Sequence, residues 1–365
     1  MDIHVGETTL QGEGQRTLVS APTSFPERYI TFLEKKKQWY TFLVSPLWLC
    51  LLITFAIRVF LIIHTHNVIE GDESLVAIQA ERILHGDFPV YFYGQPYMGS
   101  LEAYLTAILF ALLGPSVWAL RLEGALLSLV LVWLTWRLAG ALAESAKLPK
   151  LARLTFMTVA ALCAAIPPLY DGVLELHMLG GYIETFVLMI LLLLSAFQLT
   201  RRWQAGASYR ELIWRWIGIG FVVGLGLWVD PLILSAVLAS GIWILSYCSL
   251  EIWKRKQTGA SISGPWWRPA CELLLVFAAL PSSLLGMAPA LGWGVTHQWA
   301  NVVYILSLSG NETLHQKILN ALHVTESFVS CVSPRLIGGA LPIESSLLLD
   351  IHTYLFYLGL VVVVA

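Results

Sequence analysis

The chain has 365 residues, of which 57% are apolar and only 13% are charged, and its mean hydropathy is +0.71. About a quarter of the residues in a soluble domain carry charge, so this composition excludes an ordinary soluble protein and predicts an all-α polytopic membrane protein. The formal net charge of -2 points to no class of partner, and no nucleic-acid partner is expected.

The first 43 residues form a polar segment that carries three consecutive lysines, Lys35, Lys36 and Lys37. This segment lacks the apolar region and the cleavage site of a signal peptide. We therefore expect a cytoplasmic tail at 1–43, followed by a membrane core at 44–365. The five cysteines form no C-x-x-C pair, which argues against a zinc site or a disulfide framework, and no metal ligand set is assigned.

Apolar runs divide the core into about eight predicted membrane spans. Roughly 20 apolar residues are needed to cross ~30 Å of hydrocarbon. Such runs lie near residues 44–64, 116–136, 152–170, 182–199, 214–229, 231–250, 271–293 and 344–365. The last run ends without the charges or the aromatic belt of a membrane exit, so we expect that the chain is truncated at its C-terminus.

Basic residues cluster between alternate spans, and the positive-inside rule makes these connections cytoplasmic. The clusters are Arg137, Lys147, Lys150 and Arg153; Arg201, Arg202, Arg210 and Arg215; and Lys254, Arg255 and Lys256. The loops near 65–100, 171–181 and 296–343 are polar and nearly free of Lys and Arg. They are therefore expected to face outward from the plasma or inner membrane.

The first outward loop carries an unusual concentration of acids, Glu70, Asp72 and Glu73, directly after the first span. Apolar residues recur at helical spacing over 73–85, and a glycine ends the pattern, which predicts a short amphipathic helix lying along the outer interface. A turn rich in Tyr, Phe, Pro and Gly follows, and a second short apolar helix is expected at 100–113.

This order of elements resembles the GT-C glycosyltransferases. The likeness rests on the Asp72-Glu73 pair after the first span, the segment "YGQPYMGSLEAY" at 93–104, and Arg121 at the entry to the second span. Within the superfamily, the chain is most similar to bacterial relatives of the protein O-mannosyltransferases (glycosyltransferase family 39) and to the lipid A aminoarabinose transferase. The resemblance implies a GT-C transmembrane helix bundle with two interfacial helices in the first outer loop.

The activity implied by the resemblance is transfer of a hexose or pentose from a polyprenyl-phosphate-linked donor to an acceptor hydroxyl. Transfer would invert the anomeric carbon and would take place on the outer side of the membrane. The acceptor would be a glycan, a lipid or a protein, as in protein or cell-envelope glycosylation. No nucleotide-binding signature such as G-x-x-x-x-G-K-[ST] occurs, which fits a donor delivered by the membrane lipid.

The resemblance assigns Asp72 as the general base, with Glu73 orienting it or bonding the acceptor. Alternatively, the acids are a solvated helix start, since the helix dipole favours carboxylates in a first turn. Arg121 is a candidate for the donor phosphate, which Arg binds in bidentate fashion. It could instead snorkel, or pair with Glu123 or Glu102.

A second catalytic acid is expected where the fourth span begins. Glu184 is the first candidate, and Asp171 and Glu175 compete with it. The resemblance also places Tyr93, Gln95, Tyr97, Asp171 and His177 on the substrate side of the site. No cofactor is required, although some GT-C enzymes use a divalent cation, and His177 could then join Asp72 and Glu184 around it.

A transporter or flippase of lipid-linked glycans is the alternative function, and a non-catalytic scaffold is a third. Transporters place ionisable residues near the middle of the bilayer, whereas the middles of the predicted spans here are almost free of charge, with Arg58 in the first span as an exception. The acids lie at the outer edge instead, which favours interfacial chemistry. At the turn 228–231, Asp230 is expected to accept backbone hydrogen bonds.

Overall fold

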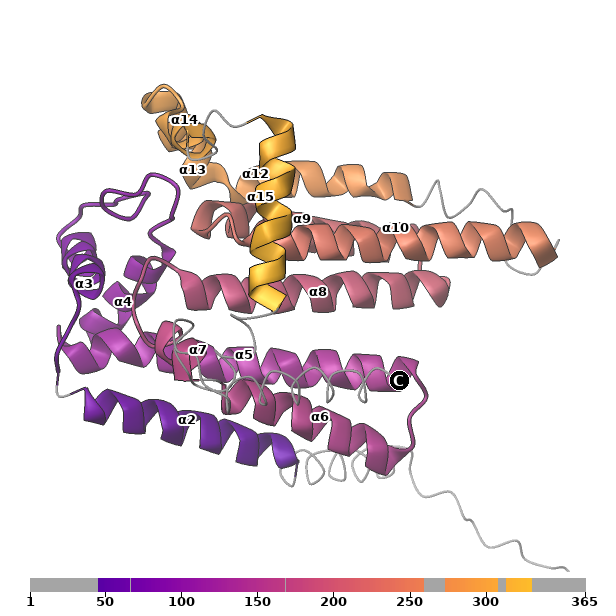
Figure 1. The fold of residues 1–365 in the computed structure, drawn as a ribbon, viewed down its shortest axis with the longest axis horizontal. Helices are drawn as coiled ribbons and strands as arrows, with labels where there is room; N and C mark the ends of the chain where they lie inside the picture. Colours follow the sequence, from indigo (N-terminus) through magenta and orange to yellow (C-terminus); the bar gives the residue numbers. More distant parts are fainter. Residues whose placement is uncertain (1–44, 66, 168, 259–272, 308–312, 330–365) are drawn as a thin grey trace, which may run out of the picture. The chain divides into compact units, whose positions relative to one another are not determined.

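The computed structural model describes residues 45–65, 67–167, 169–258, 273–307 and 313–329 (Figure 1). Over these ranges the regular elements are helices, together with one isolated bridge between Tyr91 and Gly99, so the predicted all-α class is confirmed there. The expected tail at 1–43 and the expected eighth span at 344–365 lie outside the described residues. All the helices below belong to the unit Pro46–Ala365.

Five described helices are long and apolar enough to cross a membrane: α2 (Pro46–His64), α5 (Val117–Ser145), α8 (Tyr182–Gln204), α9 (Tyr209–Val229) and α10 (Ile233–Thr258). The chain is therefore a membrane protein by length and composition. At their basic ends α5, α8 and α10 continue past the predicted limits of the apolar runs, because Arg and Lys are good helix formers. Apart from Lys147, which lies in the turn between α5 and the next helix, the basic residues expected between the spans thus lie on helices.

A sixth crossing is possible in a bent pair of helices, where the sequence predicted one span at 271–293. The pair is Leu274–Gly286, comprising η2 (Leu274–Ala278) and α12 (Ala279–Gly286), followed by α13 (Ala288–Thr296), and it bends by 60°. Pro289 lies in the first turn of α13. Proline has no N–H and clashes with the preceding turn, which favours a bend at this point.

The predicted span at 152–170 is shorter in the structure. Helix α6 (Lys150–Ala165) has 16 residues, about 24 Å at 1.5 Å per residue, and α7 (Leu169–Leu174) follows it. Helix α6 packs along α5 (Figure 1), where Gly140 faces Met157: a Cβ on this glycine would lie 2.9 Å from the methionine methyl. It carries the chain back along α5 before α8 begins.

The first loop folds into α3 (Gly71–Leu84) and α4 (Leu101–Leu113), as the sequence predicted. Val76 and Ala80 of α3 are buried in a cluster with Phe110 of α4 and with Ala119 and Leu120 of α5. The apolar face that we expected to rest on the membrane interface is therefore largely covered by protein. This packing holds α3 and α4 beside the starts of α5 and α8.

Helices α9 and α12 approach closely through small residues. Gly220 and Gly224 form a G-x-x-x-G pair on α9, and a Cβ on Gly224 would lie 1.9 Å from the carbonyl oxygen of Ser283. Small residues at this spacing allow the backbones of membrane helices to come into contact. The remaining described helices are α14 (Ala300–Ser307) and α15 (Leu314–Ser327).

Candidate functional site

Arg121 and Glu73 form a buried ion pair that joins the start of α5 to the start of α3. The Arg121 side chain is 2% exposed and that of Glu73 is fully buried. Nε of Arg121 donates to Oε1 of Glu73 at 2.9 Å, and Nη2 donates to Oε2 at 2.7 Å. Such a bidentate pair is both strong and geometrically specific.

The rest of the Arg121 guanidinium is also occupied. Nη1 donates to the hydroxyl of Thr65, and Nη2 donates to the carbonyl of Val68 at 2.7 Å. Arg121 therefore pairs with neither Glu123 nor Glu102, and its nitrogens are committed to protein groups rather than presented to a lipid phosphate. Arg121 thus connects the start of α5 to α3 and to the segment that follows the first span.

The two acids of the Asp72-Glu73 pair occupy different environments. Both oxygens of Glu73 are engaged by Arg121, and Oε2 also accepts from the backbone N–H of Glu70 at 3.1 Å. Glu73 is thus not placed to bond an acceptor. Asp72 is exposed in the first turn of α3, and its side chain makes no hydrogen bond with the residues that the structure describes. The buried acid positions the helix on which the exposed acid stands.

A second group of acids lies where α4, α5 and α8 begin. Glu102, Glu123 and Glu184 each bring one carboxylate oxygen within 4.8 Å of the others. All three side chains are buried, and we call this group the glutamate cluster. Oε2 of Glu102 accepts from the backbone N–H of Gly180 at 2.7 Å, while the other five oxygens accept no hydrogen bond from the described part of the chain.

In the part of the chain that the structure describes, no basic side chain forms an ion pair with a member of the glutamate cluster. Burial, and then the neighbouring carboxylate of Glu184, raise the pKa of Glu102 well above its ordinary value. Carboxylates this close cannot all be ionised without a counter-charge. The cluster therefore either keeps protons near neutral pH or holds a cation, for which carboxylate oxygens are suitable ligands.

Sequence reasoning found Glu184 but treated Glu102 and Glu123 only as partners for Arg121. The signal that could have found them is an acidic residue near the start of an otherwise apolar helix. Glu175, a competitor for the role of second acid, is occupied: Arg58 donates to it at 2.5 Å and Ser128 at 2.7 Å, with both members of the ion pair buried. The side chain of Asp171 lies outside the described residues.

The expected grouping of Asp72, His177 and Glu184 around a cation is not present. Nδ1 of His177 lies 3.3 Å from a carboxylate oxygen of Glu70 instead. In the ranges that the structure describes, the glutamate cluster is the group of acidic or histidine side chains with metal-ligand spacing. Glu184 therefore lies beside Glu102 and Glu123 rather than beside His177, a grouping that the sequence did not suggest.

The aromatic turn borders a cavity of about 530 Å³. Its lining comprises Tyr97, Met98, Tyr182, Asp230, Pro231, Leu232 and Ile305. Tyr97 stacks on Tyr304 with the ring centres 5.4 Å apart. Two of the other residues assigned to substrate lie elsewhere: Tyr93 accepts a hydrogen bond from Arg82 at 3.3 Å, and Gln95 is half-buried in the turn.

Asp230 has the expected structural role and a second feature that the sequence did not show. Its Oδ1 accepts from the backbone N–H of Leu232 at 2.7 Å, which confirms the predicted turn. Burial raises the pKa of Asp230. Asp230 thus contributes a carboxyl group to the wall of the cavity. The backbone N–H of Gly99 donates to the carbonyl of Val229 at 2.9 Å, which holds this turn beside the aromatic turn.

Comparison of the chain with protein-family models, with curated proteins and with solved structures finds no match. The function has to be inferred from the residues of the site.

Proposed function

We propose that this protein is a membrane glycosyltransferase of the GT-C type. It would transfer a sugar from a polyprenyl-phosphate donor to an acceptor hydroxyl, with inversion, on the outer side of the cell membrane. The observation that carries the proposal is the contrast between adjacent acids. The side chain of Asp72 is exposed and has no partner among the described residues, while the buried pair of Glu73 and Arg121 fixes the start of the same helix. A base fixed in position but open to solvent is what proton abstraction from an acceptor requires.

In the proposed reaction, the carboxylate of Asp72 takes the proton of the acceptor hydroxyl. The hydroxyl oxygen attacks the anomeric carbon, the bond from this carbon to the phosphate oxygen breaks, and polyprenyl phosphate leaves with the electron pair. Glu73 and Arg121 act as positioning residues, because neither has a free polar atom to offer the substrates.

The cavity beside the aromatic turn is a suitable place for the sugar. Its volume of about 530 Å³ lies within the range of small-molecule sites. Tyr97 and Tyr182 supply aromatic surface, and the Asp230 carboxyl supplies a polar group that can orient sugar hydroxyls. Tyr97 and Met98 belong both to the segment 93–104, which carries the resemblance, and to the lining of this cavity.

The test is release of polyprenyl phosphate from candidate lipid-linked sugars by the purified full chain. Asp72→Asn should lower the rate by about 100-fold or more, as expected for loss of a general base. Glu81→Gln, which alters an exposed acid of the same helix, is the matched control and should keep full activity. Full activity in folded Asp72→Asn would overturn the mechanism.

A flippase or transporter of lipid-linked glycans is the second candidate, and the glutamate cluster favours it. Buried acids without a counter-charge within membrane helices commonly mark proton or ion pathways. In vesicles, such a protein would move a labelled lipid-linked glycan between leaflets without releasing polyprenyl phosphate. Glu123→Gln should then stop the movement while Asp72→Asn leaves it unchanged. The glycosyltransferase proposal expects sugar transfer and no such movement.

A further inference from the structure

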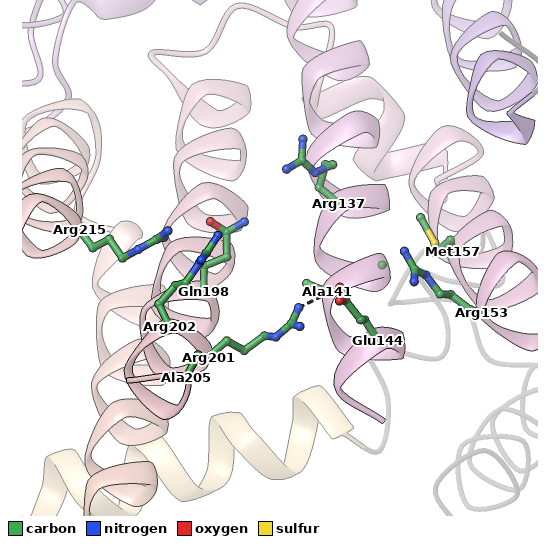
Figure 2. Close-up of a pocket in the computed structure, with 11 residues that line it drawn as sticks. Arg137, Ala141, Glu144, Arg153, Met157, Gln198, Arg201, Arg202, Ala205 and Arg215 are labelled. Carbon is green, nitrogen blue, oxygen red and sulfur yellow. Dashed lines mark hydrogen bonds and ion pairs between the residues drawn. The ribbon is translucent and has the colours of Figure 1, made fainter. Parts of the chain in front are cut away.

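A second cavity lies at the far ends of α5 and α8 from the glutamate cluster, and five arginines line it. Its volume is about 560 Å³. The arginines come from four helices: Arg137 from α5, Arg153 from α6, Arg201 and Arg202 from α8, and Arg215 from α9. Figure 2 shows Arg201 reaching from α8 toward Glu144 of α5, with Arg153 approaching the same carboxylate from α6. We call this cavity the arginine pocket.

The arginine pocket carries more positive charge than its acidic neighbours neutralise. Arg201 pairs with Glu144 at 3.0 Å, and Glu211 pairs with Arg215 at 3.1 Å and with Arg202 at 3.6 Å. Arg137 and Arg153 form no ion pair with the described residues. Two carboxylates facing five guanidinium groups leave an excess of three positive charges around one cavity.

The positive-inside rule accounts for arginines at this end of the helices, but neither that rule nor helix packing explains why five of them line one cavity. The contact between α5 and α6 at this level is made by Gly140 and Met157, and both are apolar lining residues of the pocket. Like charges gathered at one cavity repel each other, which costs free energy that an anion in the cavity would offset. A bound anion would therefore explain why the arginines gather at this cavity.

The chemistry of guanidinium selects among anions. Its planar fork donates two parallel hydrogen bonds and matches a phosphate better than a spherical ion. A cavity of about 560 Å³ exceeds what one inorganic phosphate fills and is in the range for a phosphate ester. Two exposed aromatic residues, Tyr209 and Trp214, lie on α9 near Arg215, as is usual where helices leave the hydrocarbon layer.

We propose that the arginine pocket binds a phosphate-bearing anion, either the headgroup of an anionic membrane lipid or a soluble phosphate ester. Basic pockets between membrane helices are suited to acidic headgroups. The proposal does not depend on glycosyl transfer: Glu123 of the glutamate cluster is roughly 20 to 30 Å along α5 from Arg137 and Glu144.

The test uses the purified full chain in a neutral detergent. Bound phosphatidylglycerol and phosphatidylcholine are counted by native mass spectrometry, and inorganic pyrophosphate is titrated in a second arm that follows the midpoint of thermal unfolding. The test variant is Arg137→Gln combined with Arg153→Gln, which removes two charges without breaking an ion pair. Arg210→Gln is the matched control, because Arg210 is exposed on α9 and does not line the pocket.

Wild type should bind phosphatidylglycerol about tenfold or more tightly than phosphatidylcholine, and the double variant should lose most of this preference, since each charged hydrogen bond accounts for a factor of about ten. The control should match wild type. If pyrophosphate stabilises wild type but not the double variant, and no lipid preference is found, a soluble phosphate ester is the ligand. Equal binding of both probes by wild type and the double variant overturns the proposal.

Discussion

The two ends of α5 place charge in opposite ways. Near its start, Glu123 belongs to a cluster of three acids that are almost completely buried and form no ion pair with the described residues. Near its end, Arg137 and Glu144 belong to a pocket whose arginines are half-buried or exposed, and three of these arginines are paired with acids. The end with the glutamate cluster also holds the buried pair of Arg121 and Glu73. We therefore expect burial, rather than the number of charges, to decide how strongly each end depends on its ion pairs.

The physical reason is the cost of removing a charge from water. A buried ion that loses its partner keeps the whole desolvation penalty, whereas an exposed ion recovers it from solvent. The end of the molecule with the glutamate cluster should therefore be sensitive to single substitutions. The end with the arginine pocket should tolerate them.

Arg121→Ala should have the largest effect, because it leaves Glu73 buried without a partner. The expected loss of unfolding free energy is about 3–5 kcal/mol, measured by thermal or chemical unfolding of the purified protein in detergent. Arg82→Ala is the control: this arginine is 59% exposed and should matter little. Replacing both members of the pair, as Arg121→Met with Glu73→Leu, should restore much of the stability. Equal stability of Arg121→Ala and wild type would show that the pair is not buried as described.

The pH dependence of stability should have an intermediate effect and reports on Glu102. Its pKa is raised in the folded protein, chiefly by burial and then by Glu184. A raised acid contributes stability that is complete below its unfolded pKa of about 4.3 and is lost as the pH rises through the folded value. Wild type should thus become less stable as the pH rises above the pKa that Glu102 has in the unfolded chain. Glu102→Gln should flatten this dependence of stability on pH.

Thermal unfolding across this pH range provides the measurement, with Glu81→Gln as an exposed-acid control. A wild-type profile that rises with pH, and rises further when a divalent cation is added, would contradict protonation of the glutamate cluster and indicate a bound cation in its place.

Arg202→Ala should have the smallest effect. Its side chain is 60% exposed and lies 3.6 Å from Glu211, which Arg215 also contacts. Exposed pairs of this kind contribute about 0–1 kcal/mol. The same unfolding measurement should place this variant close to wild type. A loss as large as that of Arg121→Ala would remove the contrast between the two ends.

The sequence by itself determined the membrane class and the local elements of the first loop. The density of apolar residues predicted the membrane class, and local periodicity predicted the short helices near 73–85 and 100–113, which the structure places at Gly71–Leu84 and Leu101–Leu113. The turn with Asp230 was also predicted, because its hydrogen bond reaches only two residues along the chain. These features depend on residues that are close together in the chain, so they can be predicted from the sequence.

The tertiary structure alone decided the partners. Arg121 pairs with Glu73, 48 positions away, rather than with the nearer acids that the sequence suggested. Glu102, Glu123 and Glu184 meet because three helices begin at one place, and five arginines share a pocket because four helices end or begin at another. Which face of each helix turns inward depends on contacts such as that between Gly140 and Met157. Those contacts form between segments that are distant in the chain, so local periodicity does not predict them.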